Sequence, residues 1–299
     1  KEIDDVPKPQ KKYIMSTYRI NFKQLRQRPD FLEMLAALER GFKKFHVDFY
    51  LVGAVARDLW MTAINAIPPS RITRDIDFAI FIEDKGTYQK LKRYLIEIEH
   101  FHPSKENTFV LLWQGRMQVD LLPFGNTEDE NAKVIFEGTG LTTLNMPGFM
   151  EIYESGLPEV ELEKKHRFKF CTLPGIVILK LIAWEDRPEI RRDDLKDILI
   201  ILAHFFEMYT DQIYAHHSDL FGDDDFGLNL IASRVMGREM KKIAIRNEKL
   251  NERLTNLLEK NTMDVNTSEI GKIMANWANT TVAESLKPLL EIQRGFRGE

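Results

Sequence analysis

The 299-residue chain contains little cysteine and no long apolar run. Its single cysteine, Cys171, excludes a disulfide framework and favours a reducing compartment. The longest apolar runs, such as residues 176–184 with Lys180 inside, are far too short to span a bilayer. The opening segment KEIDDVPKPQKKY is charged and lacks the apolar stretch of a signal peptide. The sequence therefore predicts a cytoplasmic protein without membrane contact.

A surplus of positive charge is also missing, because 42 Lys and Arg residues are outnumbered by 46 Asp and Glu residues, for a net charge of −4. No global field attracts nucleic acid, so contact with RNA would need a local patch. One candidate patch, here called the basic stripe, is five residues at helical spacing: Arg238, Lys242, Arg246, Lys249 and Arg253. An RNA-binding surface and an ordinary solvated helix face both explain it.

The secondary-structure signals change in character near residue 172. Before it, strand-like and helix-like stretches alternate; after it, the spacing is helical almost to the end. Gln114-Gly115 separates two β runs within 108–124 and predicts a hairpin. Further strands are predicted at 49–53, at 75–82 and within 133–172. Helices are predicted at 22–46, 54–64, 85–99, 174–186, 193–209, 228–259 and 267–293.

These signals predict an α/β (α+β) protein with a mixed sheet, flanking helices and a mainly helical C-terminal region. We expect a flexible N-terminal segment over residues 1–20. A catalytic domain is expected over 21–172 and a helical domain over 173–299.

Two carboxylates stand one residue apart in the stretch RITRDIDFAI, residues 71–80. Side chains alternate along a strand, so Asp75 and Asp77 point the same way while Ile76 points into the core. Two such carboxylates repel each other unless a positive charge lies between them. Oxygen ligands of this kind suit Mg²⁺ or Mn²⁺. Solvated acids at the end of a strand are the alternative.

A third acid, Asp120, lies in the apolar stretch MQVDLL. If the hairpin lies beside the Asp75 strand, the three acids converge at one sheet edge, as in two-metal phosphoryl transfer. Gly53 ends the first buried strand and opens a helix, where free N–H groups attract phosphate. A plain strand-to-helix turn is the alternative explanation of Gly53.

The segments LVGAVARDLW, RITRDIDFAIFI and MQVDLLPF, in this order, resemble the nucleotidyltransferase superfamily that includes DNA polymerase β and the CCA-adding enzymes. The sequence is most similar to the AbiEii/AbiGii toxin-type and related minimal nucleotidyltransferases, over roughly residues 48–200. The resemblance implies a polymerase-β-like fold and transfer of a nucleoside monophosphate from an NTP to an acceptor hydroxyl, with Mg²⁺ or Mn²⁺.

The resemblance also implies roles for individual residues. Asp75, Asp77 and Asp120 would bind the metal ions, and Asp120 would accept the proton of the attacking hydroxyl. The nucleotide would be bound by Gly53, Ala54, Arg57, Arg71, Thr73 and Lys180, with Asp58, Asp194 and Asp197 as supporting residues. Lys180 could equally be a lysine whose stem lies along a buried helix. Ala54 departs from the family's second glycine, and the gap between Gly53 and Asp75 is longer than in the minimal family.

The acceptor implied by the resemblance is an RNA or tRNA end or a protein side chain, and an antitoxin partner would accompany a toxin. Two other functions compete with this one. The first is a catalytically silent nucleotidyltransferase fold that acts as a binding module. The second is a small-molecule adenylyltransferase of the antibiotic-modifying type, which would need a deep acidic acceptor pocket.

Overall fold

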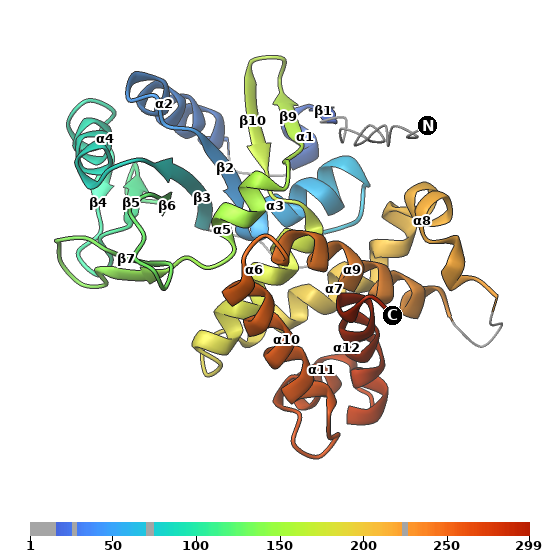
Figure 1. The fold of residues 1–299 in the computed structure, drawn as a ribbon. Helices are drawn as coiled ribbons and strands as arrows, with labels where there is room; N and C mark the ends of the chain where they lie inside the picture. Colours follow the sequence, from blue (N-terminus) through green and yellow to red (C-terminus); the bar gives the residue numbers. More distant parts are fainter. Residues whose placement is uncertain (1–15, 26–28, 70–74, 223–226) are drawn as a thin grey trace, which may run out of the picture.

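The computed structural model describes residues 16–25, 29–69, 75–222 and 227–299 (Figure 1). These residues form a mixed α/β fold, as the sequence predicted: a large sheet with flanking helices, followed by a helical C-terminal region. Figure 1 shows α2 and α4 together beside the sheet, and helices α6 to α12 gathered at the lower right.

The sheet contains both parallel and antiparallel neighbours, in the order β1-β9-β10-β2-β3-β6-β5-β4. The central pair β3 and β6 is parallel, whereas β2 runs antiparallel to β3 and β5 antiparallel to β6. The bounds are β1 Thr17–Ile20, β2 Phe49–Val52, β3 Asp75–Ile82, β4 His102–Pro103, β5 Val110–Trp113, β6 Met117–Gly125, β9 Glu159–Leu162 and β10 His166–Phe170. A separate small sheet pairs β7 Lys133–Ile135 with β8 Thr143–Asn145.

The helices lie mostly after residue 172. Those within the sheet region are α1 Phe22–Leu25, α2 Phe31–Lys44, α3 Gly53–Asp58, the π-helix η1 Leu59–Ile64, α4 Lys85–Glu97 and α5 Phe149–Glu154. Those of the C-terminal region are α6 Leu173–Asp186, α7 Arg192–Met208, α8 Thr210–His216, the 3-10 helix η2 Ser218–Leu220, α9 Leu228–Ala244, α10 Glu248–Thr262, α11 Glu269–Ala278 and α12 Val282–Arg297.

Several predictions from local patterns are confirmed. Strand β3 spans residues 75–82 as predicted, and β5 and β6 form the predicted hairpin. Gln114 and Gly115 at its tip have φ of 50° and 65°. The loop between the strands has three residues, 114–116, and the N–H of Arg116 donates to the carbonyl of Trp113 at 3.0 Å, so that Gln114 and Gly115 are the central residues of a tight turn.

Two predictions for the N-terminal region were wrong. Residues 17–20 were expected to be flexible, but they form β1, which pairs in parallel with β9. The single helix predicted over 22–46 is instead α1 and α2, with residues 26–28 outside the described part. Residues 29 and 30 form a turn, and α2 begins after them at Phe31.

The two longest predicted helices are also divided. The helix predicted over 228–259 breaks between α9 and α10, where the side chain of Asn247 accepts a hydrogen bond from the N–H of Leu250 at 3.3 Å. The helix predicted over 267–293 breaks at Asn279, which adopts a left-handed conformation with φ of 51°. Asparagine favours both positions, because it caps helices and tolerates positive φ.

The buried apolar side chains form one cluster, from Ile20 in the sheet to Phe296 in α12. A division into two domains near residue 172 stays a prediction, although α6 does begin at Leu173. In the described part of the chain, no helix combines the length and the apolar character needed to cross a membrane.

Candidate functional site

The parallel pairing of β3 with β6 brings two of the three acids side by side. Asp77 is directly opposite Asp120 in the register, and on the other side of β3 it is opposite Val52. Asp75, two residues earlier, is exposed, whereas the side chains of Asp77 and Asp120 are half-buried. The two strands do lie side by side, but both are inner strands of the sheet and Asp75 is opposite Gln118, so the convergence of all three acids stays a prediction.

The two half-buried acids hold their protons unusually well. Burial first, and then the charges of Asp120 and Asp75, raise the pKa of Asp77 to about 7, against the lowering effect of Lys180 and Arg191. Burial likewise raises the pKa of Asp120 to about 6, although a hydrogen bond from Gln118 lowers it. Carboxylates that repel each other in a partly buried place are typical of functional sites.

The donor set fits a hard divalent cation, because all of its ligands are carboxylate oxygens. The raised pKa values of Asp77 and Asp120 also show that a positive charge beside them would relieve repulsion. Within the described ranges, however, no three Asp, Glu, His or Cys side chains are grouped closely enough to hold one metal ion. Asp77 and Asp120 are in register, but their side chains and that of Asp75 do not form a three-carboxylate metal site in this structure.

Gly53 lies directly against Asp77. Its φ of +68° is a left-handed conformation, and a Cβ atom built there would lie 2.1 Å from Oδ2 of Asp77. Glycine is therefore required both by the backbone turn and by the approach of the carboxylate. Helix α3 has only six residues, so its N-terminus does not by itself make a phosphate site.

Five of the predicted site residues, three carboxylates and two cations, form a buried ion network. Arg57 donates to Oδ1 of Asp58 at 3.0 and 2.7 Å and pairs with Asp197 through its other nitrogen. Lys180 donates to Oδ1 of Asp194 at 2.7 Å and pairs with Oδ2 of Asp197 at 2.8 Å. The network joins α3, α6 and α7.

The network corrects two roles implied by the resemblance. Arg57 is only 1% exposed, so its guanidinium cannot meet a nucleotide that arrives from solvent. Lys180 already has two carboxylate partners and is 7% exposed. Asp58, Asp194 and Asp197 hold these cations in place. Direct nucleotide contact by Arg57 does not agree with these contacts, and a supporting role of the three acids at a nucleotide site stays a prediction.

Two residues near the acids were missed from the sequence. Gln118 donates to Oδ1 of Asp120 at 2.8 Å and fixes the direction of that carboxylate. Arg191, the residue before α7, lowers the pKa of both Asp77 and Asp120 by its charge. The sequence could have indicated Gln118, because it lies two residues before Asp120 on the same strand and the two side chains therefore share a face of the sheet. No local signal indicates Arg191, which is brought close by the fold.

The remaining predicted nucleotide contacts divide into two kinds. Ala54 is 7% exposed in the first turn of α3, so that any contact would come from its backbone. Arg71 and Thr73 lie outside the described residues.

The basic stripe does not lie on one helix. Its first two members are on α9, which ends at Ala244, and its last two are on α10, which begins at Glu248. Arg246 lies in the turn between the helices. The prediction of a continuous basic helix face was wrong, because Asn247 starts a new helix in another direction.

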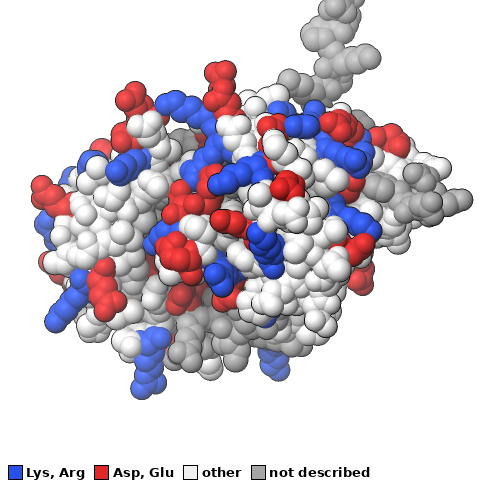
Figure 2. Space-filling view, turned by 90° about the horizontal axis from the view of Figure 1, so that it is seen from below, with Lys and Arg blue, Asp and Glu red and all other residues white. Residues whose placement is uncertain are grey.

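Members of the stripe are also paired within the protein. Arg238 pairs with Asp219 at 2.6 Å, Arg253 pairs with Asp186 at 2.5 Å, and Lys249 donates to a backbone carbonyl. Figure 2 shows basic and acidic side chains interspersed on the face seen from below. The described residues therefore give no support to the stripe as an RNA-binding surface.

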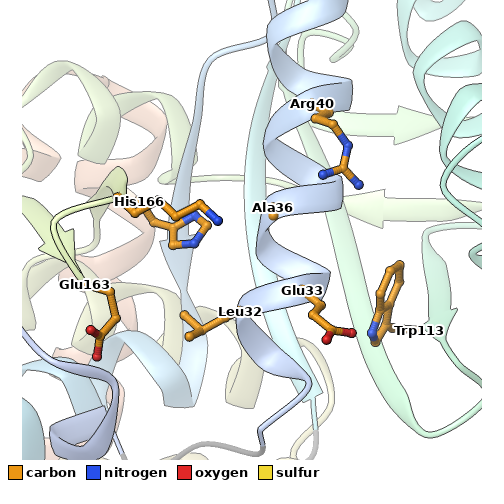
Figure 3. Close-up of a pocket in the computed structure, with 8 residues that line it drawn as sticks. Leu32, Glu33, Ala36, Arg40, Trp113, Glu163 and His166 are labelled. Carbon is orange, nitrogen blue, oxygen red and sulfur yellow. The ribbon is translucent and has the colours of Figure 1, made fainter.

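A hollow of about 420 Å³ lies on the outer side of α2, away from these residues. Leu32 and Ala36 of α2 form part of its lining, with Trp113 on one side and His166 on the other (Figure 3). None of the predicted site residues that the structure describes lines it. The register and chemistry of the acids, and not this hollow, therefore identify the candidate site.

Comparison with known proteins gives slight likenesses only. No protein-family model and no curated protein matches the chain. Among solved structures, the antibiotic-resistance factor ANT(2'')-Ia is similar at 11% identity and a TM-score of 0.31, over 62% of this chain and 97% of that one. A nucleotidyltransferase-like protein from Paracoccidioides brasiliensis is similar at 11% identity and a TM-score of 0.38, over 67% of this chain and 91% of that one.

The Thermotoga maritima CCA-adding enzyme complexed with tRNA is similar at 13% identity and a TM-score of 0.28, over 92% of this chain and 83% of that one. These neighbours include nucleotidyltransferases. With TM-scores below 0.5, they leave the activity to be argued from the residues of this chain.

Proposed function

We propose that the protein is a metal-dependent nucleotidyltransferase, which transfers a nucleoside monophosphate from an NTP to an acceptor hydroxyl and releases pyrophosphate. The observation that carries this proposal is the register of Asp77 with Asp120 beside Gly53. Two carboxylates with raised pKa values, one of them directly against the glycine that opens α3, match the needs of metal-assisted phosphoryl transfer.

Each residue has a role in this reaction. Asp75, Asp77 and Asp120 would hold Mg²⁺ or Mn²⁺, which supplies positive charge to the transferring phosphoryl group. Asp120, whose pKa is raised to about 6, is the better placed base for the proton of the acceptor hydroxyl, because Gln118 fixes its carboxylate. Gly53 makes room for the carboxylate of Asp77 beside the first turn of α3.

The acceptor is proposed only as a class, a hydroxyl of RNA, of a protein side chain or of a small molecule. The divided basic stripe removes the reason to prefer RNA. A toxin role with an antitoxin partner, and a cytoplasmic location, stay predictions from the sequence.

Binding and transfer can be tested separately. We expect Mn²⁺ with a suitable NTP to raise the melting temperature, because a ligand that binds only the native state stabilises it, by about 2.7 kcal/mol at a hundredfold excess over Kd. Each of the common NTPs is tested alone, with the metal alone and the NTP alone as controls. A folded sample that none of them stabilises would favour the silent binding module.

Transfer is then followed with NTP labelled at the α-phosphate or at the γ-phosphate, mixed with tRNA, a protein fraction or aminoglycosides. Nucleotidyl transfer moves the α-label to the acceptor and leaves the γ-label in pyrophosphate. Labelling from the γ-position would instead identify a kinase and contradict the proposal. Asp77→Asn serves as the inactive control, since it removes one metal ligand.

A further inference from the structure

The cations around the candidate site differ in how far they are already paired. Arg57 is enclosed at 1% exposure between Asp58 and Asp197. The ammonium of Lys180 has carboxylate oxygens at 2.7 and 2.8 Å. A phosphate could gain either cation only by taking it from a buried carboxylate, and an unpaired buried charge is costly.

Arg191 is different. Its side chain is 44% exposed, and the ion pair recorded for it is a loose one, with Nη1 3.8 Å from Oδ2 of Asp194. That separation is too long for a hydrogen bond. A guanidinium has five N–H donors, so most of its donor capacity is open to a ligand.

The partner oxygen is itself unusual. Oδ2 of Asp194 is buried and has no hydrogen-bond partner, although Oδ1 of the same carboxylate accepts from Lys180. Buried polar atoms are rarely left without a partner. A shift of Arg191 by about 1 Å would satisfy this oxygen. Asp194 is thus placed to hold one edge of the guanidinium while the other edge stays free.

The position of Arg191 and the shape of its guanidinium also favour a phosphate ligand. Asp194, the partner of Arg191, belongs to the buried ion network, which runs through Lys180 and Asp197 to Arg57 of α3. Helix α3 begins at Gly53, beside Asp77, so the network links Arg191 to the candidate site. A guanidinium fork matches the geometry of phosphate oxygens better than an ammonium does.

We propose that Arg191 binds the triphosphate of the nucleotide, that Asp194 positions it, and that Lys180 serves the buried network and leaves the phosphates to Arg191. This inference rests on the proposed nucleotidyltransferase function. It assigns to the segment between α6 and α7 a contact that the sequence motifs had given to a lysine inside α6.

The test compares binding of three probes by calorimetry, each with Mg²⁺: the NTP that stabilises the wild type, the corresponding nucleoside, and inorganic tripolyphosphate. We expect Arg191→Ala to weaken the NTP and tripolyphosphate by about 10- to 100-fold, the range of a charged hydrogen bond, and to leave the nucleoside unchanged. Arg191→Lys should recover part of the loss. Arg192→Ala is the matched control, because Arg192 is the adjacent exposed arginine at the start of α7.

The outcomes separate this inference from the function on which it rests. A wild type that binds NTP and an Arg191→Ala variant that binds it equally well would overturn the inference alone. Equal losses in Arg191→Ala and Arg192→Ala would also overturn it, since they would indicate a general field effect. A wild type that binds neither NTP nor tripolyphosphate would overturn both proposals.

Discussion

At the scale of single residues, Gly53 leaves no room for a side chain beside the carboxylate of Asp77. The atom that a Cβ would meet, Oδ2, is the end of a flexible side chain. The carboxylate can rotate away at small cost in stability, but it then leaves the position beside Asp120. Substitution of Gly53 should therefore affect ligand binding more than folding.

This separation can be measured with two matched glycines. Gly53 and Gly115 have φ of +68° and +65°, but a Cβ at Gly115 meets nothing within 4 Å. Alanine in a left-handed conformation costs about 1–2 kcal/mol, so we expect Gly53→Ala and Gly115→Ala to lose similar stability in urea unfolding. Only Gly53→Ala should lose the stabilisation by metal and NTP. Normal stabilisation of Gly53→Ala would contradict the role given to this contact.

At the scale of secondary-structure elements, α3, α6 and α7 are joined through the buried ion network. Each helix supplies charge to it, and Asp197 contacts cations from both other helices, Arg57 and Lys180. Such a network specifies how the helices meet, since a change in their packing would leave buried charges unpaired.

We expect Asp197→Asn to lower the free energy of unfolding by about 3 kcal/mol or more, because it leaves two buried cations with only part of their compensating charge. Urea unfolding measures this loss. Glu189→Gln, an exposed acid between α6 and α7, is the control and should change stability by less than about 0.5 kcal/mol. If Asp197→Asn lowers the free energy of unfolding by no more than the Glu189→Gln control does, the network does not stabilise the packing of these helices.

At the scale of the whole molecule, stability should depend on pH through a few acids. The pKa is raised to about 7 in Asp77, to about 6 in Asp120 and to about 7 in Glu128, each mainly by burial. The native protein therefore keeps protons that the unfolded chain has released. Stability is greatest near the ordinary carboxyl pKa and is lost as pH rises through the native values. Acids with lowered pKa, such as Glu99, act only at lower pH.

We expect the melting temperature without metal to fall between about pH 5 and about pH 8, by roughly 3–6 °C for a loss of about 1–2 kcal/mol. Asp77→Asn should reduce this fall, because the variant cannot ionise at that position. Its melting temperature should exceed that of the wild type at about pH 8 and match it at about pH 5. Mn²⁺ should restore the wild type at the higher pH and leave the variant unchanged. A variant with the full pH dependence would show that Asp77 is not the group responsible.

The sequence by itself determined the features that depend on neighbours along the chain. Alternation placed Asp75 and Asp77 on one side of a strand, Gln114-Gly115 marked the hairpin, and helical spacing marked the C-terminal region. These signals are local because pleat, turn and helix repeat are properties of a few consecutive residues.

Only the tertiary structure decided which residues meet. It paired Asp77 with Asp120 across parallel strands, enclosed Arg57 and Lys180 among carboxylates, set Arg191 beside Asp194 and divided the basic stripe at Asn247. Whether a charged side chain serves a ligand or a neighbouring helix depends on burial and on partners distant in sequence. Local patterns contain neither, because both are fixed by how the sheet and the helices pack.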